Sequence, residues 1–312
     1  VGGNLGPPAL DLLEDGCQLY VLELSSFQLE RAGELGLAVA AVLNVSADHL
    51  DRHGSMPAYH AAKHRIFRGC DKVVVNRDDP LTIPLVGPRV DVISWRLGEP
   101  ELNGFGVREI DGERWICHGF EALMNVSEMR LAGRHNLANG LAALALGHAA
   151  GLAFEPMLST LRSFRGLPHR CQQVAEIGGV RYIDDSKGTN VGATQAALVG
   201  LGDGENLVLL AGGQGKGADF SQLREPVSRH CKLLVLFGED AGLLETSLEG
   251  CAPVIRADSL EGAVKIAVDQ ARRGDTVLLS PACASLDMFS SYVARGEAFQ
   301  AAVQAIAGVA HD

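Results

Sequence analysis

The sequence predicts an α/β protein with two domains, each built on a mostly parallel sheet. Its 312 residues exceed the usual length of one domain, and 47% of them are hydrophobic, which is enough for two separate cores. Short apolar runs alternate with helical patterns through most of the chain, which is typical of parallel strands joined by helices. A segment with Gly166 and Pro168 interrupts this alternation. We therefore predict domains at residues 1–166 and 167–312.

Three apolar runs predict the parallel strands of the first domain, at residues 19–24, 38–45 and 73–76. A helix is predicted at residues 57–68, because a Ser precedes it and a Pro stands in its first turn. Lys63 would lie in the middle of this helix.

The end of the first domain departs from the parallel pattern. Residues 107–129 alternate between apolar and polar around Asp111-Gly112, a pair typical of hairpin turns, and predict a small antiparallel patch beside the sheet. A helix rich in Leu and Ala follows at residues 136–150, where Gly151 is typical of a helix end.

Four further apolar runs predict the second domain, a doubly wound Rossmann-like sheet. They lie at residues 207–210, 233–237, 254–255 and 276–279. Ligands of such sheets bind beyond the carboxyl ends of the strands. Polar residues that directly follow a strand are therefore the candidates for a site.

The composition disfavours several classes of protein. With 27 basic and 38 acidic residues, the formal net charge of -11 disfavours nucleic-acid binding, because phosphates need clustered Lys and Arg. No apolar run is long enough for a membrane span, and the first residues lack the basic and apolar regions of a secretory signal. The seven cysteines are widely spaced without a zinc-like pattern, which fits a reduced cytoplasm.

Two polar clusters follow neighbouring strands of the first domain. Residues 23–28 (ELSSFQ) come after the first predicted strand and residues 44–51 (NVSADHLD) after the second, so both are expected at one edge of the sheet. Carboxylate and imidazole ligands suit Mg²⁺ or Mn²⁺ better than structural zinc. The alternative for each residue alone is a helix cap or a solvated side chain.

Two Gly-containing segments follow strands of the second domain. Residues 212–218 hold a G-x-G-x-x-A spacing, but the helix expected after them contains Pro226, which disfavours an NAD site. Residues 184–190 (DDSKGTN) lie between a strand and a helix, where free backbone N–H groups attract phosphate or carboxylate. Here the alternative is an Asp or Ser cap beside a solvated Lys.

Six ordered motifs resemble the Mur ligase family, most closely its D-glutamate-adding branch. They are ELSSFQ at residues 23–28, NVSADHLD at 44–51, GRHN at 133–136, LPHR at 167–170, DSKGTN at 185–190 and SPACASL at 280–286. The resemblance implies a central ATPase-type domain, truncated at its N-terminus, followed by a Rossmann-like domain that binds the amino acid. It also implies a cytoplasmic and monomeric enzyme.

The resemblance implies an ATP-dependent amide ligase of peptidoglycan synthesis. ATP would convert the carboxylate of UDP-N-acetylmuramoyl-L-alanine into an acyl phosphate, and the amine of D-glutamate would displace the phosphate. Such an enzyme acts mainly by orienting two anionic substrates and by neutralising charge on the transferred phosphoryl group.

The resemblance also assigns metal and catalytic roles. Glu23 and His49 match metal ligands of the family, and Lys63 matches a lysine that the family carries as a carbamate. A carbamate would supply anionic oxygens to Mg²⁺, or Mn²⁺, where a bare ammonium would repel the cation. The alternative for Lys63 is an ordinary exposed lysine. The catalytic candidates are His49, Lys63 and Lys187.

Contacts to the substrates follow from the same resemblance. Asn136 and Asn139 match adenine contacts, Arg170 a contact to the ATP phosphates and Asp185 a ribose contact. Positions near the other two substrates are matched by Asn4, Ser25, Lys187, Thr189, Lys216, Ser285 and Tyr292. The family commonly has Phe at the last position, so a backbone contact is expected there more than a side-chain contact.

The phosphate-binding loop of the family is missing from the sequence. No G-x-x-x-x-G-K-[ST] motif occurs, since the Gly215-Lys216 pair is followed by Gly217. In the family, that loop and a uridine-binding domain precede the segment that matches Asn4. We therefore interpret the chain as part of a longer protein and expect no turnover from it alone.

Three alternatives stay open. Another Mur ligase or a folylpolyglutamate synthase would share the chemistry, although the D-N-P-R motif typical of the diaminopimelate-adding branch is missing. A non-catalytic nucleotide-binding protein would have lost the phosphate loop by evolution. A Rossmann oxidoreductase would bind NAD and would not need Mg²⁺.

Overall fold

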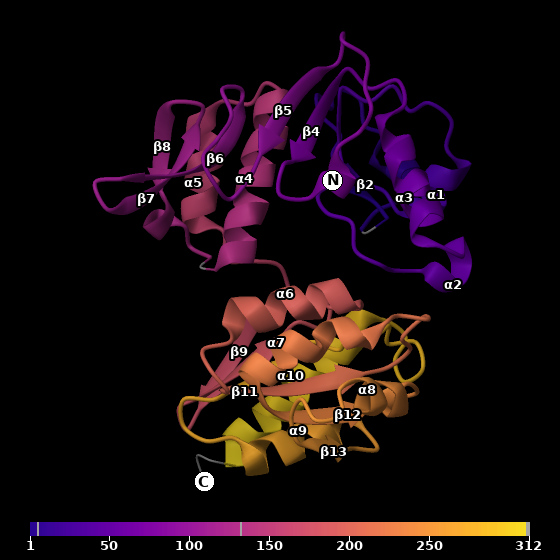
Figure 1. The fold of residues 1–312 in the computed structure, drawn as a ribbon, viewed down its shortest axis with the longest axis vertical. Helices are drawn as coiled ribbons and strands as arrows, with labels where there is room; N and C mark the ends of the chain where they lie inside the picture. Colours follow the sequence, from indigo (N-terminus) through magenta and orange to yellow (C-terminus); the bar gives the residue numbers. More distant parts are fainter. Residues whose placement is uncertain (5, 132, 310–312) are drawn as a thin grey trace. The chain divides into compact units, whose positions relative to one another are not determined.

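The computed structural model describes residues 1–4, 6–131 and 133–309, which form two compact units (Figure 1). The first unit comprises Val1–Val45, His53–Ala132 and Asn136–Phe164. The second comprises Ser46–Arg52, Gly133–His135 and Arg165–Asp312. A single boundary near Gly166 stays a prediction, because two short segments that precede it belong to the second unit.

A six-stranded sheet forms the centre of the first unit. The first four strands run parallel and the last two continue the same sheet antiparallel. In sheet order they are β3 (Val39–Ala41), β4 (Lys72–Asn76), β5 (Asp91–Trp95), β6 (Gly104–Ile110), β7 (Glu113–His118) and β8 (Glu121–Asn125). The predicted hairpin is confirmed: Asp111 and Gly112 both have positive φ, at 52° and 80°, as its tight turn requires.

Helices cover both faces of this sheet. On one face, Leu141 and Leu144 of α4 (Arg134–Ala149), with α5 (Phe154–Ser163), pack around Val74. On the other face, Tyr59 of α3 (Met56–His64) and Phe67 of the 3₁₀ turn η2 (Arg65–Phe67) pack around Val73 and Val75. Strand β4 is thus buried on both sides, which explains its continuous apolar run.

The predicted strand at residues 19–24 differs from the expectation. Only β2 (Leu22–Glu23) forms, and it pairs in parallel with β1 (Gly2–Gly3) in a separate two-stranded sheet. Leu19 and Val21 are exposed, so the prediction of a buried strand in the main sheet is wrong. The shorter elements of this half of the chain are η1 (Ala9–Leu12), α1 (Ser26–Arg31), α2 (Leu50–His53), η3 (Pro80–Thr82) and η4 (Val126–Glu128).

The second unit is the predicted doubly wound sheet, in the order β13-β12-β11-β14-β10-β9. All pairs are parallel except the one between β9 and β10. The strands are β9 (Gln172–Ile177), β10 (Val180–Asp184), β11 (Leu207–Gly212), β12 (Cys231–Phe237), β13 (Val254–Arg256) and β14 (Thr276–Leu279). From β11 the chain runs outward to β13 and then returns to the other side of β11, so the order in which the strands are added reverses between β11 and β14.

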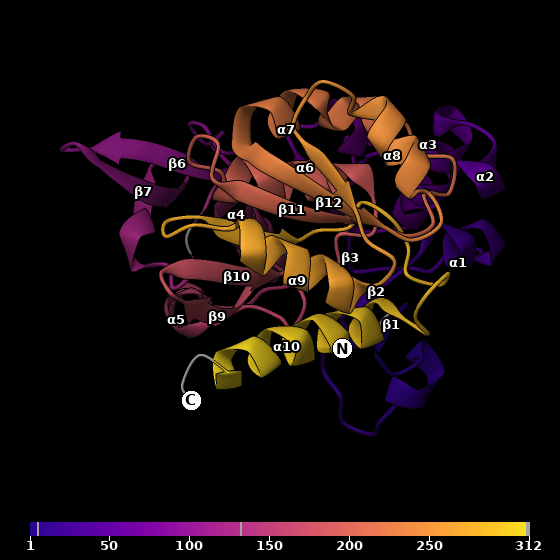
Figure 2. The same ribbon diagram turned by 90° about the horizontal axis from the view of Figure 1, so that it is seen from below.

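Helices cover this sheet in two layers (Figure 2), and alternate residues of its strands pack on one layer or the other. Leu209 of β11 packs on the layer of α6 (Val191–Leu201), η5 (Phe220–Leu223), α7 (Arg224–His230) and α8 (Ala241–Ser247). Its neighbour Leu210 packs on α9 (Leu260–Gln270) and α10 (Tyr292–Val309). None of the helices in the described part of the chain is long and apolar enough to cross a membrane.

Candidate functional site

Three loops with predicted site residues leave the carboxyl ends of adjacent strands in the second unit. Residues 185–190 follow β10, residues 213–218 follow β11 and residues 280–286 follow β14. The last two loops also bond to each other, since the N–H of Gln214 donates to the carbonyl of Ala284 at 3.0 Å. A Cβ at Gly213 would overlap that carbonyl, so this Gly serves a close approach of two backbones. The glycine-rich segment therefore has a structural explanation that needs no dinucleotide.

Lys216 makes a short ion pair in this region. Its Nζ lies 2.6 Å from Oδ1 of Asp48, which belongs to the segment Ser46–Arg52 of the second unit. The Nδ2 of Asn190 donates to the other oxygen of Asp48 at 3.1 Å. The side chains of Lys216 and Asp48 are only 18% and 12% exposed. Lys216 thus holds a carboxylate in a largely dry place, where such a pair is strong but costly to desolvate.

The charge balance around Asp48 favours its ionised form. Burial alone would raise the pKa of this carboxyl, but the charge and the hydrogen bond of Lys216 outweigh it, with help from His49 and Asn190. The pKa of Asp48 is therefore lower than usual.

A small pocket lies at the ion pair of Lys216 with Asp48. It is lined by Ala47, Asp48, His49, Leu50, Thr189, Asn190, Gly215, Lys216 and Ala218.

His49 also turns toward Asp48. Its backbone N–H donates to Oδ1 of Asp48 at 2.9 Å, and its ring Nε2 lies 3.8 Å from the same oxygen. The residue adopts a left-handed backbone with φ of 53°, which is uncommon outside glycine. The structure thus brings together His49, Thr189 and Lys216, three of the predicted site residues.

Lys187 and Tyr292 form a second contact between predicted residues. The Nζ of Lys187 lies 4.3 Å from the centroid of the Tyr292 ring, within the range of a cation–π interaction. The carbonyl of Tyr292 accepts a hydrogen bond from Oγ of Ser186 at 2.7 Å. Ser285 is buried, and its carbonyl accepts the N–H groups of Met288 and Phe289.

Both carboxylate oxygens of Asp185 already accept hydrogen bonds within the protein. One oxygen accepts from Oγ of Ser280 at 2.7 Å, and the other accepts from the N–H of Cys171 at 3.2 Å. Burial raises the pKa of Asp185 to about 6, although these hydrogen bonds oppose the shift. A ribose hydroxyl would have to share these oxygens. The nearby Arg170 is exposed.

The predicted residues of the first unit lie on separate elements. The Nδ2 of Asn4 donates to Oε1 of the exposed Glu23 at 3.3 Å. Ser25 caps α1 in a reciprocal capping box with Gln28, which is the structural alternative for that residue. In the ELSSFQ segment, Glu23 therefore bonds to Asn4, and Ser25 and Gln28 cap the helix that follows.

Lys63 lies in the last turn of α3, and the prediction that it sits in the middle of its helix is wrong. The chain tightens into a 3₁₀ turn from Arg65, which ends the α-helix early. The Nζ of Lys63 lies 5.1 Å from the Tyr59 ring centroid. Asn136 and Asn139 are three residues apart on α4 and therefore share one face of that helix.

The donor set for a metal ion is incomplete within either unit. Glu23 and Lys63 belong to the first unit and His49 to the second. In the described ranges, no group of three or more His, Cys, Asp or Glu side chains could hold a metal ion. The expectation that ELSSFQ and NVSADHLD follow strands of one sheet is also wrong, because β2 and β3 belong to different sheets. A metal site made by these residues stays a prediction.

Several residues of the second unit were missed by the sequence analysis. Asp184 lies in the predicted anion-binding segment 184–190 and Ser280 in the motif SPACASL, but neither was given a role of its own. Asp48 stands in the NVSADHLD segment next to His49. Arg295 gave no signal, because an arginine on an amphipathic helix reads as exposed, yet it is only 1% exposed.

Two family models match the chain. The Mur ligase middle domain matches residues 6–147, and the Mur ligase glutamate ligase domain matches residues 169–283. Similar curated proteins include two proteins named UDP-N-acetylmuramoylalanine–D-glutamate ligase. The one from Pseudomonas syringae pv. tomato is 56% identical over 308 residues, and the one from Pseudomonas aeruginosa is 57% identical over 310 residues. Each comparison covers 98% of this chain and 69% of the relative.

Solved structures show the same fold at lower identity. The UDP-N-acetylmuramate-alanine ligase MurC from Thermotoga maritima has a TM-score of 0.62 at 17% identity, covering 91% of this chain and 64% of that chain. FolC from E. coli in complex with ADP has a TM-score of 0.63 at 18% identity, covering 92% and 67%.

Proposed function

Because this chain belongs to the Mur ligase family, and within it to the UDP-N-acetylmuramoylalanine–D-glutamate ligases, we propose that it carries out D-glutamate addition as part of a longer ATP-dependent enzyme. UDP-N-acetylmuramoyl-L-alanine would be the acceptor, and the reaction would serve peptidoglycan synthesis in the cytoplasm. The observation that carries the proposal most directly is the ion pair of Lys216 with Asp48, which shows a lysine already binding a carboxylate.

The pocket at Lys216 suits the carboxylate of an amino acid. Lys216 and Thr189 both line it, and the ammonium group is only 2.6 Å from the carboxylate of Asp48. A substrate carboxylate would take the place of Asp48 on Lys216. Because the site is largely dry, this exchange of one carboxylate for another keeps the lysine paired and avoids the cost of a lone buried charge.

Each unit carries residues that we propose as nucleotide contacts. Asn136 and Asn139 offer amide groups to adenine from one face of α4, and the exposed Arg170 offers a fork of donors to phosphate oxygens. Asp185 would position the ribose, directly or through its neighbours. The chain spans 69% of the length of the two curated relatives.

A divalent cation, Mg²⁺ or Mn²⁺, would neutralise charge on the transferred phosphoryl group. Glu23 fits such a role, because it is exposed and its one described side-chain hydrogen bond comes from Asn4. His49 would be a second ligand. Lys63 would serve as a carbamate, in which case its contact with the Tyr59 ring would lose its cationic character. The carbamate would remove the positive charge of Lys63 and add anionic oxygens, and both effects would help a cation to bind.

The chemistry requires two transfers. An oxygen of the alanyl carboxylate attacks the terminal phosphorus of ATP and forms an acyl phosphate, and ADP leaves. The amine of D-glutamate then attacks the carbonyl carbon, loses a proton and expels phosphate. Lys187 lies in the loop 185–190 and would stabilise the negative charge that develops in both steps.

The test is phosphate release by the full gene product with ATP, Mg²⁺ and UDP-N-acetylmuramoyl-L-alanine. We expect release with D-glutamate and none above background with L-glutamate, lysine or diaminopimelate. Release with one of the other amino acids would move the protein to a sister branch. No release with any of them would overturn the proposal and favour a non-catalytic nucleotide-binding protein.

A further inference from the structure

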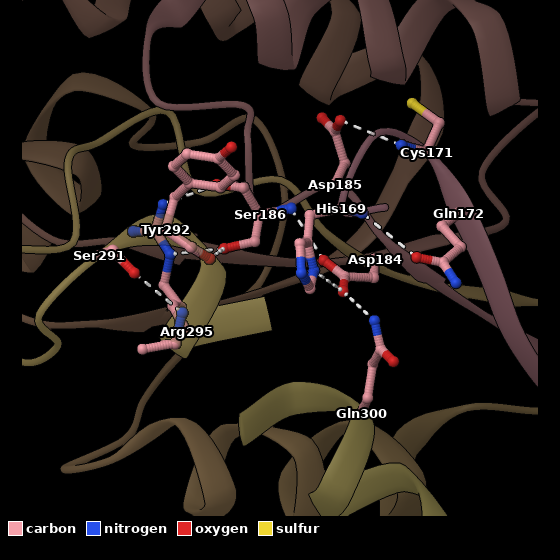
Figure 3. Close-up of polar contacts among 11 residues, drawn as sticks. His169, Cys171, Gln172, Asp184, Asp185, Ser186, Ser291, Tyr292, Arg295 and Gln300 are labelled. Atoms are coloured by element: carbon pink, nitrogen blue, oxygen red, sulfur yellow. Dashed lines mark hydrogen bonds and ion pairs between the residues drawn. The ribbon is translucent and has the colours of Figure 1, made fainter. Parts of the chain in front are cut away.

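A buried carboxylate joins two predicted ligand-binding segments in the second unit (Figure 3). Asp184, the last residue of β10, is 0% exposed. Its Oδ2 lies 2.8 Å from Nδ1 of His169, and its Oδ1 accepts the N–H of Ser186 at 2.9 Å. Asp184 therefore binds the segment before β9 with one oxygen and the loop after β10 with the other.

His169 extends this link to the neighbouring residues of both segments. Its carbonyl accepts the N–H of Lys187 at 3.0 Å, and the residue that follows it is Arg170. Its backbone is left-handed, with φ of 60°, and its ring is buried. A non-glycine residue holds that conformation only where its surroundings fix it. Here the side-chain contact to Asp184 does so.

One face of α10 supports the pair. Gln300 donates from Nε2 to Oδ2 of Asp184 at 2.7 Å, and Figure 3 shows Asp184 between His169 and Gln300. One turn earlier, a Cβ at Gly296 would overlap Nδ1 of His169, so the glycine makes room for the ring. Arg295 beside it donates to the carbonyl of Ser186 at 2.9 Å.

Stability alone does not account for this arrangement. A buried polar pair adds little to stability compared with apolar residues of the same size, because desolvation offsets the attraction. The contacts of this pair are instead directed at the two segments that carry Arg170 on one side and Lys187 and Thr189 on the other. Such contacts preorganise groups that must act together.

We propose that Asp184 is a positioning residue that couples the segment of Arg170 to the loop 185–190. The ligands of the two segments are those of the proposed function, on which this inference rests. Arg170 would bind the phosphates of ATP, and Lys187 and Thr189 would bind the amino-acid substrate. Loss of Asp184 would loosen both segments together, because each depends on the same carboxylate. The binding of the nucleotide and of the amino acid would therefore weaken in parallel.

Three variants separate positioning from general stability. Asp184→Ala removes the link, whereas Asp184→Asn keeps groups able to bond Ser186 and His169. The matched control is Asp275→Asn, which breaks another largely buried pair of the same unit: Oδ2 of Asp275 lies 2.6 Å from Nζ of Lys232. Asp275 directly precedes the amino end of β14, opposite to the edge where the site lies.

Hydrogen exchange measured by mass spectrometry tests the coupling without any ligand. In the full-length protein, Asp184→Ala should raise amide exchange at least about tenfold in residues 165–171 and 185–190 alike, with Asp184→Asn close to the parent. Asp275→Asn should leave both segments unchanged. Faster exchange in only one segment, or equal exchange with all three variants, would overturn the proposal.

Steady-state kinetics provide the second readout. Asp184→Ala should raise the KM for ATP and the KM for D-glutamate by a similar factor of about tenfold, while Asp184→Asn restores most of both and Asp275→Asn changes neither. A KM change for one substrate only would contradict the coupling. An inactive parent protein would contradict the proposed function, and the exchange measurement would still decide the coupling.

Discussion

The two units differ in how far the fold alone assembles the predicted site. In the second unit, the loops after β10, β11 and β14 meet, and Lys216, Thr189 and His49 surround one carboxylate. In the first unit, the predicted residues lie on separate elements, and Ser25 is occupied as a helix cap. A complete doubly wound sheet gathers its loops at one edge by topology, whereas the two-residue strand β2 has only β1 as a partner. The fold of the first unit alone therefore does not bring its predicted residues together.

The largest effect should come from Lys63. Its substitution tests whether activity needs the predicted residues of the first unit. In the full-length enzyme, we expect Lys63→Ala and Lys63→Arg to lower kcat by about 1000-fold, because neither side chain can form the anionic carbamate. Because Lys63 is half-buried and its Nζ lies 5.1 Å from the Tyr59 ring centroid, the melting temperature of each variant is measured beside kcat to separate lost chemistry from lost stability. Carbon-13 NMR after labelling with bicarbonate should show a carbamate signal that both variants lack. Unchanged kcat in the two variants would exclude the carbamate.

Lys216 should give the next largest effect. Its substitution tests the predicted site of the second unit. Lys216→Gln should raise the KM for D-glutamate by about 100-fold, since a largely buried carboxylate would lose its charged partner. The KM for ATP should change much less. Lys232→Gln is the control, because Lys232 makes an ion pair of the same length, 2.6 Å, outside the site. Equal effects of the two substitutions would show that Lys216 has no special part in binding.

The burial of Asp185 should make the free energy of unfolding depend on pH. Burial raises the pKa of the Asp185 carboxyl to about 6 in the folded state, from its ordinary value of 3.8. The folded state therefore prefers the protonated carboxyl, and this contribution to stability is full below pH 4 and is lost as the pH rises through about 6. Relative to Asp185→Asn, the parent should lose about 2 kcal/mol of unfolding free energy between pH 4 and pH 7. Urea unfolding at several pH values measures this, and parallel curves for the two proteins would contradict it.

Ser25 should show the smallest effect. As a cap of α1, Ser25→Ala should cost about 1 kcal/mol of unfolding free energy. Ser259→Ala removes a comparable cap from α9 in the second unit and is the control, because Ser259 accepts the N–H of Gly262 at 3.0 Å. If Ser25 only caps the helix, both variants keep the KM for UDP-N-acetylmuramoyl-L-alanine. A KM increase for Ser25→Ala alone would show a substrate contact in addition to the cap.

The elements that the sequence predicted best are those with strong local patterns. The four runs of the second sheet appear as β11 to β14, and the Asp111-Gly112 turn forms its hairpin. Residues 19–24 have the same apolar character as a buried strand, but their burial depends on which segment pairs with them, and that is not a local property. The length of α3 was missed for a similar reason, because the 3₁₀ turn packs Phe67 into the core.

The candidate site was predictable in its residue types and not in its pairings. The family resemblance pointed to Lys216, Thr189 and His49, but the contact of Lys216 with Asp48 spans 168 positions of sequence, which no spacing rule reaches. The buried place of Arg295 and the room left by Gly296 likewise arise from the packing of α10. These contacts decide how the loops are held.

The most direct test of the account is isotope transfer during turnover by the full gene product. UDP-N-acetylmuramoyl-L-alanine labelled with oxygen-18 in its alanyl carboxylate is supplied with ATP, Mg²⁺ and D-glutamate, and the released phosphate is analysed by mass spectrometry. An acyl phosphate intermediate predicts that each phosphate carries one oxygen from the carboxylate. Unlabelled phosphate formed together with the amide product would contradict the proposed chemistry.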